Sequence, residues 1–211
     1  MIMYKPERLA AFCDGVVAIA ITLLVLGLEV PTASKVPEQD LKAYLYDMLH
    51  PLIGYISSFV LIGTYWLAHY VIFHHVVRVD RIFIALNGLF LCLVAFVPFP
   101  TGVQATYRGD PIAFLLYAIT HVACSLSLCA LWLYATRGHR LVDTSLPDTS
   151  IAMIQRRLLL PPAVCVMAML LSAINLNLGR LVFLLIPLFY FVRPGMDERG
   201  GSLDSTTRGK G

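Results

Sequence analysis

The sequence predicts an all-α integral membrane protein with six transmembrane helices per subunit. Of its 211 residues, 58% are hydrophobic and 14% are charged, whereas soluble domains have about 45–50% apolar and about 25% charged residues. Apolar stretches recur along the chain, and about 20 such residues cross a bilayer as a helix. Lysine and arginine also concentrate in alternate connecting segments, which is typical of cytoplasmic loops.

The six expected spans are stretches with few or no charged residues. They are Arg8 to Val30, Pro51 to Phe73, Ile82 to Gln104, Pro111 to Thr136, Leu158 to Leu176 and Leu181 to Val192. The sixth has only 12 residues when Arg180 lies outside it, so it crosses where flanking residues snorkel or the bilayer thins. Residues 1–193 are therefore expected to form one six-helix transmembrane domain.

The segments between the spans predict an orientation. With the N-terminus inside, twelve of the 16 lysines and arginines lie on the inner side. The four outer ones are Lys35, Lys42, Arg108 and Arg180. This bias predicts that both termini are cytoplasmic. A short outer helix is expected from Pro37 to Leu49, and residues 194–211, rich in glycine, serine and threonine, are expected to be a disordered tail.

Charge and cysteine content argue against several functions. The net charge of +3 is small for this length and gives no reason to expect a nucleic-acid partner. The five cysteines lie in apolar stretches without a Cys-x-x-Cys pair, so we expect neither disulfides nor a metal site. A cleaved signal peptide is disfavoured because the first apolar run contains Asp14 and lacks a small-x-small cleavage site.

Asp14 is an ionisable residue inside the first expected span, where charge is costly and usually faces protein or water. On a helical wheel the apolar stripe consists of Ile19, Thr22, Leu23 and Leu26. Asp14 lies roughly 140° from Ile19, so it points away from this stripe and into the surrounding protein. We expect a buried polar network that docks the first helix. Its members are Arg8, Asp14, Trp66, His69 and Asn87.

The first span resembles a known signature. Arg8, Phe12, Cys13 and Asp14, followed by an apolar helix, are similar to the Arg-x-x-x-Phe-Ser-Asp motif of the transmembrane protein 175 family of lysosomal and prokaryotic potassium channels. Further matches are Tyr65-Trp66-Leu-Ala-His69, Asp80, Leu86-Asn87-Gly88-Leu89-Phe90 and Pro98-Phe99-Pro100-Thr101. The chain departs from the family at Cys13, where relatives have serine, and at Tyr70, where many have a second histidine.

The resemblance implies a homotetramer of six-helix subunits whose first helices surround a central pore. By position, Ile19 matches the family's hydrophobic constriction, Leu23 and Leu26 match further pore-facing rings, and Thr22 matches a pore-facing threonine. The implied function is a weakly selective potassium channel in a prokaryotic plasma membrane, with potassium ions and membrane lipid as partners. The Thr-Val-Gly-Tyr-Gly filter of other potassium channels does not occur in the sequence.

Two other function classes were weighed against the channel. A proton-coupled secondary transporter would use Asp14 and His69 as its proton-handling pair, and it predicts broken helices and an internal repeat. The two halves show no convincing repeat, and Pro161-Pro162 is the only strong candidate for an interruption within a helix. An enzyme is not expected, nor is a cofactor, because no His-x-x-x-His or glutamate pair at metal-ligand spacing occurs.

Overall fold

The structure is a computed structural model that describes residues 6–31 and 40–191, with side-chain burial described up to Phe183. Its elements are α1 (Pro6–Leu23), η1 (Leu24–Gly27), α2 (Leu41–His75), α3 (Arg81–Phe96), α4 (Pro98–Thr106), α5 (Pro111–Thr136), η3 (Arg137–His139), α6 (Asp148–Ile174) and α7 (Leu176–Phe191). In these residues the β-type pairing is one isolated bridge between Val76 and Val142. The all-helical prediction is therefore confirmed.

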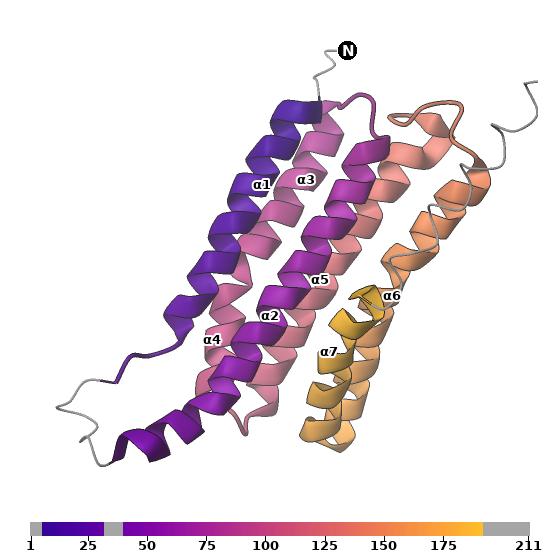
Figure 1. Cartoon of the computed structure of the whole chain (residues 1–211). Helices are drawn as coiled ribbons and strands as arrows, with labels where there is room; N and C mark the ends of the chain where they lie inside the picture. The colour runs from indigo at the N-terminus through magenta and orange to yellow at the C-terminus, as the bar shows by residue number, and fades with distance from the viewer. Residues whose placement is uncertain (1–5, 32–39, 192–211) are drawn as a thin grey trace, which may run out of the picture.

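The helices lie side by side along an elongated bundle (Figure 1). Five segments are long and apolar enough to cross a membrane, and they include α1 with η1 and the joined pair α3 and α4. The sixth pass, α7, has 16 residues, which span about 24 Å of a hydrocarbon core about 30 Å thick. The expected fold class of six membrane passes is confirmed, and the last pass is short.

The sixth pass begins earlier than expected, at Leu176 instead of Leu181, so Arg180 lies inside α7. The reason is local capping. Asn175 ends α6 in an extended conformation, and its side-chain oxygen accepts a hydrogen bond from the backbone N–H of Asn177 at 2.9 Å. This cap satisfies a free donor at the start of α7 and makes the turn between α6 and α7 one residue long.

Two other expected boundaries are wrong. The outer helix expected from Pro37 to Leu49 is not separate: from Leu41 on it is the first part of α2, which runs through Pro51 without a break, and residues 37–39 lie outside the described residues. Similarly, α6 begins at Asp148 and not at Leu158, and it continues through Pro161-Pro162. The apolar criterion finds only the lipid-compatible part of a helix, and neighbouring helices let prolines persist in membrane helices. The expected tail, residues 194–211, lies outside the described residues.

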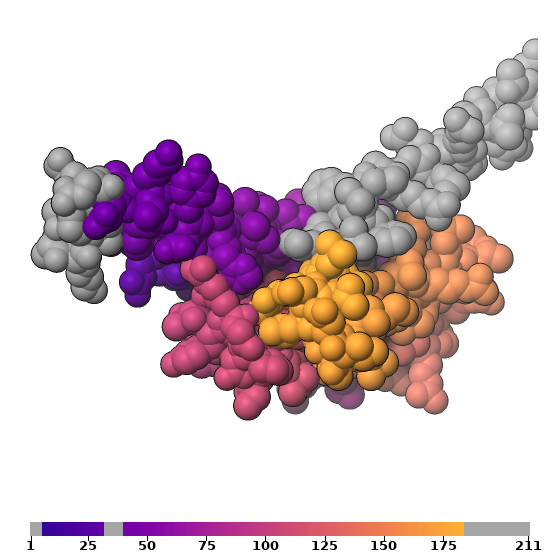
Figure 2. Space-filling view, turned by 90° about the horizontal axis from the view of Figure 1, so that it is seen from below, coloured from indigo at the N-terminus to yellow at the C-terminus, as the bar shows by residue number. Residues whose placement is uncertain are grey.

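Helix α5 is the centre of the subunit, and it packs against α2, α3, α4 and α6. Its Trp132 and His121 are fully buried. By contrast, α1 contacts only one side of the bundle, through α2, α3 and α4. Seen from below, α6 lies at one end of an elongated outline and the first turns of α2 lie at the other (Figure 2). One face of α1 is therefore left without a partner among the described residues of the subunit.

The loop before α3 is held by a buried aspartate. Asp80 caps α3 by accepting the N–H of Phe83 at 2.8 Å, and its other oxygen accepts the hydroxyl of Tyr134 at 2.7 Å. The carboxylate is 2% exposed, so both bonds are shielded from water. This contact ties the start of α3 to the end of α5 and thereby sets the position of Asn87 two turns farther along.

Candidate functional site: the first helix and its polar contacts

Helix α1 has two faces with different surroundings. The packed face consists of Cys13, Val17, Ala20 and Leu24, which are 1–4% exposed. On the other face Ile19 is 61% exposed, Leu23 41% and Leu26 75%. The two sets alternate at helical spacing, so a single apolar helix presents one stripe to the bundle and another to the outside.

The exposed stripe follows the spacing of a helix–helix seam. Its members are Phe12, Gly15, Ile19, Thr22, Leu23 and Leu26, all of them exposed. Most of these positions are three or four residues apart, as in the contact faces of helices that pack around a common axis. The structure thus places all four residues predicted to face the pore on one unpartnered surface.

Thr22 is the polar member of this stripe. Its hydroxyl donates a hydrogen bond to the backbone oxygen of Ile19 at 2.8 Å. The donor is therefore used within the helix, and the lone pairs of the hydroxyl oxygen stay available on the exposed side. An oxygen in this state can accept from water or coordinate a cation.

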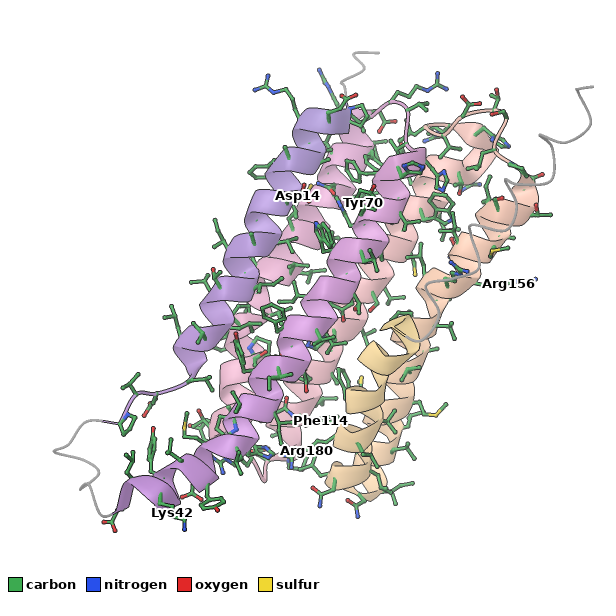
Figure 3. All side chains as sticks on the ribbon, in the orientation of Figure 1. Asp14, Lys42, Tyr70, Phe114, Arg156 and Arg180 are labelled. Carbon is green, nitrogen blue, oxygen red and sulfur yellow. The ribbon has the colours of Figure 1, made fainter. Side chains whose placement is uncertain are left out.

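Asp14, between Phe12 and Gly15 on α1, contacts α2. The indole N–H of Trp66 donates to its carboxylate at 2.8 Å, and the Trp66 ring lies 6.2 Å from the ring of Tyr70. Asp14 and Tyr70 lie at similar height on neighbouring helices (Figure 3). Both Asp14 and Trp66 are exposed within one subunit, so this bond lies on the surface of the bundle. The sequence had predicted a buried network, and for this bond that prediction is wrong.

A second set of polar contacts is fully enclosed. The His69 Nε2 and Asn87 Oδ1 atoms are 2.9 Å apart, and the Asn87 amide donates to the Cys13 sulfur at 3.1 Å. The His69 ring is stacked between Phe73 and Phe90, with centroids at 4.3 Å and 5.3 Å. These contacts join α1, α2 and α3 in the half of the bundle that contains the start of α1.

Four of the five predicted network residues therefore lie in two bonded groups, Asp14 with Trp66 and His69 with Asn87. Arg8 is exposed, and no hydrogen bond or ion pair joins it to another residue in the part of the chain that the structure describes. Sequence reasoning did not predict that Cys13 accepts from Asn87. The available signal was its place beside Asp14 in the motif.

A polar cluster that the sequence did not indicate lies between α2, α4 and α5. Ser58 is fully buried and bonds to Thr101 at 2.9 Å and to Tyr117 at 3.2 Å. Two turns farther along α2, the Tyr65 hydroxyl lies 2.9 Å from the His121 Nδ1 atom. These residues lie on α2, α4 and α5, and no local pattern in the sequence connects them.

A multi-pass helical subunit with an unpartnered apolar face on its first helix is typical of membrane proteins that assemble around a pathway. The family described as endosomal/lysosomal potassium channel TMEM175 matches residues 8–98. A potassium channel of Chamaesiphon minutus is 34% identical over 192 residues, which are 90% of this chain and 95% of that protein. A potassium channel of Streptomyces collinus is 40% identical over 149 residues, 67% of this chain and 69% of that protein.

The fold agrees with these relatives. The crystal structure of a lysosomal potassium-selective channel TMEM175 homolog from Chamaesiphon minutus matches with a TM-score of 0.80 at 31% identity, covering 90% of this chain and 98% of that one. The human endosomal/lysosomal proton channel TMEM175 is 34% identical over 113 residues, 51% of this chain and 22% of that protein. The chain belongs to the TMEM175 family.

Proposed function

We propose that the protein is a weakly potassium-selective cation channel, formed by four copies of the chain with their α1 helices around a central pore. The observation that carries this proposal is the exposed stripe of α1, in a chain whose near-full-length relative is a potassium channel. A stripe with Ile19 and Leu26 more than half exposed is buried once other α1 helices face it. One subunit has no second α1 to do so.

In this assembly Ile19 forms the narrowest ring, with rings of Leu23 and Leu26 beyond it. A narrow apolar ring tends to lose its water, and an ion that crosses it must shed part of its hydration shell. Opening then requires the α1 helices to move apart or rotate. The Thr22 oxygen, which keeps free lone pairs, offers hydrated cations a polar contact between the apolar rings.

The contacts of α1 with its own subunit hold the helix for this role. Cys13 lies on the packed face and accepts from Asn87, while Asp14 accepts from Trp66 at the edge of the stripe. Two bonds in different directions oppose rotation of α1 about its axis. The proposed role of Asp14, Trp66, His69 and Asn87 is thus structural; Arg8 has an exposed position that suits the membrane interface.

The charge distribution supports a prokaryotic plasma-membrane channel with a cytoplasmic N-terminus. The segments that flank the start of α1, the link from α2 to α3 and the link from α5 to α6 carry Arg8, Arg78, Arg81, Arg137 and Arg140. The segments at the other ends of these helices carry Lys42, Arg108 and Arg180. The basic end is expected to be cytoplasmic.

Potassium is favoured over protons as the permeant ion because the relatives that match most of this chain are named potassium channels. The human relative named a proton channel matches only about half of it. The transporter alternative needs Asp14 and His69 to exchange a proton. Among the described residues each bonds elsewhere, Asp14 to Trp66 and His69 to Asn87. We assign no catalytic activity.

The test is the Ile19→Asn variant in planar bilayers under a potassium gradient. A polar ring holds water, and lowering the barrier by about 1.4 kcal/mol raises the current about tenfold. We expect unitary currents from the natural protein and larger, less selective currents from the variant. Val25→Asn is the matched control, because Val25 is also exposed but lies outside the stripe.

Two results would contradict the proposal. If Ile19→Asn and Val25→Asn change the current equally, Ile19 is not the constriction. If the purified protein has a mass other than about four times the 23.4 kDa of one chain, the tetrameric pore is wrong. Slow, substrate-dependent flux without unitary currents would instead support a transporter.

A further inference from the structure

The end of the bundle opposite Arg8 contains a cavity of about 190 Å³ between α2, α4, α5 and α7. Its lining includes Arg180, the imidazole of His50 and the small side chain of Ala105. Arg180 and Phe114 lie near each other beside α2 (Figure 3), and Figure 2 views the molecule from this end. The channel proposal does not use this cavity, which lies within one subunit and away from the α1 stripe.

Arg180 is the cation that lines this cavity. Its guanidinium donates to the backbone oxygen of Arg108, and Arg108 donates to the backbone oxygen of Asp47 at 2.7 Å. The imidazole of His50 also lines the cavity. A second arginine, 72 residues away in sequence, thus lies next to the site through its backbone contact with Arg180.

Neither arginine is neutralised. In the described ranges, 6–31 and 40–191, the one ion pair joins His139 to Asp148 at the opposite end. The Nε atom of Arg180 is buried without a hydrogen-bond partner among these residues. A guanidinium offers five donors in a planar fork that matches phosphate. An unpaired donor beside a cavity at the membrane interface therefore favours an anionic ligand.

The other residues that line the cavity indicate what kind of molecule bears the anionic group. Ile53, Phe114 and Phe183 line the apolar side, while Ser57 and Gln104 add polar groups. A volume of about 190 Å³ is below the roughly 300–1,000 Å³ of a drug-sized ligand site, so the cavity admits a headgroup and the start of a chain but not a whole amphiphile. A free phosphate ion would gain nothing from the aromatic walls.

We propose that this cavity binds the phosphate group of an anionic phospholipid from the outer leaflet, with Arg180 as its principal ligand and the lipid chains lying outside along α2 and α7. The bound lipid joins α7, the shortest pass, to α2 and α4. Arg108, whose backbone oxygen accepts from Arg180, adds positive charge next to the cavity. The proposal does not depend on the ion that the channel conducts.

The experiment is native mass spectrometry of the detergent-purified protein with added phosphatidylglycerol, and with phosphatidylcholine for comparison. We expect retention of phosphatidylglycerol over phosphatidylcholine, and a fall of about tenfold or more in Arg180→Gln, because hydrogen bonds to charged groups are among the strongest. Lys42→Gln is the matched control: it removes another outer cation, at the start of α2 (Figure 3) and away from the cavity, and should retain lipid normally.

Ala105→Phe provides an independent variant that fills the cavity and keeps both arginines, so the proposal can be tested even if Arg180→Gln folds poorly. It should also lose the lipid. Equal retention by Arg180→Gln, Ala105→Phe and the natural protein would overturn the proposal. Displacement of phosphatidylglycerol by millimolar inorganic phosphate would overturn the lipid assignment and identify a phosphate-ion site. Equal retention of both lipids would show that net negative charge is not recognised.

Discussion

The enclosed contact among His69, Asn87 and Cys13 makes a quantitative prediction for Asn87→Leu. The substitution keeps the side-chain volume nearly constant but removes the acceptor for His69 and the donor for Cys13. Hydrogen bonds between membrane helices contribute about 0.6 kcal/mol each, and a buried polar atom left unpaired costs about 1–3 kcal/mol. Asn87 is fully buried and His69 is 3% exposed, so water does not replace the lost partner.

The sum predicts a loss of about 2–4 kcal/mol in the free energy of unfolding. Chains of this size lose roughly 2–4 °C in Tm per kcal/mol, so the Tm should fall by about 5–15 °C. The assay is thermal unfolding of detergent-purified protein followed by tryptophan fluorescence, which reports from Trp66 and Trp132. Asn177→Leu is the control, because Asn177 is exposed.

A Tm for Asn87→Leu within a degree or two of that of Asn177→Leu would refute the reasoning, since the enclosed contact would then contribute nothing. A double-mutant cycle with Cys13→Ala isolates one part of it. If the sulfur is a real acceptor, the two changes should be less than additive. Strict additivity would show that the Cys13 contact is only close packing.

Two further predictions concern stability. Tyr65→Phe removes the hydroxyl that bonds to the buried His121 ring and should lower the free energy of unfolding by about 1–3 kcal/mol, measured as a fall in Tm. The control is Tyr55→Phe, on the same helix and half-buried, which should change the Tm little. Equal Tm shifts in the two variants would contradict this prediction. Asp80→Ala removes a helix cap and the bond from Tyr134 and should cost about 1–2 kcal/mol. Its control, Asp40→Ala, loses no capping bond because the Asp40 side chain makes none, and an equal loss there would show that the Asp80 bonds do not matter.

The properties of α1 were predictable because they are local. Hydropathy shows that the segment crosses the membrane, and the helical period separates Ile19, Leu23 and Leu26 from the packed residues. The structure leaves that predicted stripe exposed. Whether the stripe lines a pore is decided between subunits, and the tetramer test addresses it.

The ends of the helices were less predictable. Composition located the lipid-compatible parts of α2 and α6, but both helices extend beyond them. The extra turns carry polar and charged residues such as Arg156, which are good helix formers in water. A hydropathy criterion cannot detect them, because it measures whether a segment is compatible with lipid and not whether its backbone is helical.

The residue contacts depended on tertiary structure. The sequence predicted one network that included Arg8 and left out Cys13. The described contacts instead leave out Arg8 and include the bond between Asn87 and Cys13. The approach of Arg108 and Arg180 joins residues 72 positions apart. Membrane crossing and helix faces are set by short-range patterns along the chain. Pairings of this kind arise only when separate helices pack, because packing sets which donors and acceptors meet where water is absent.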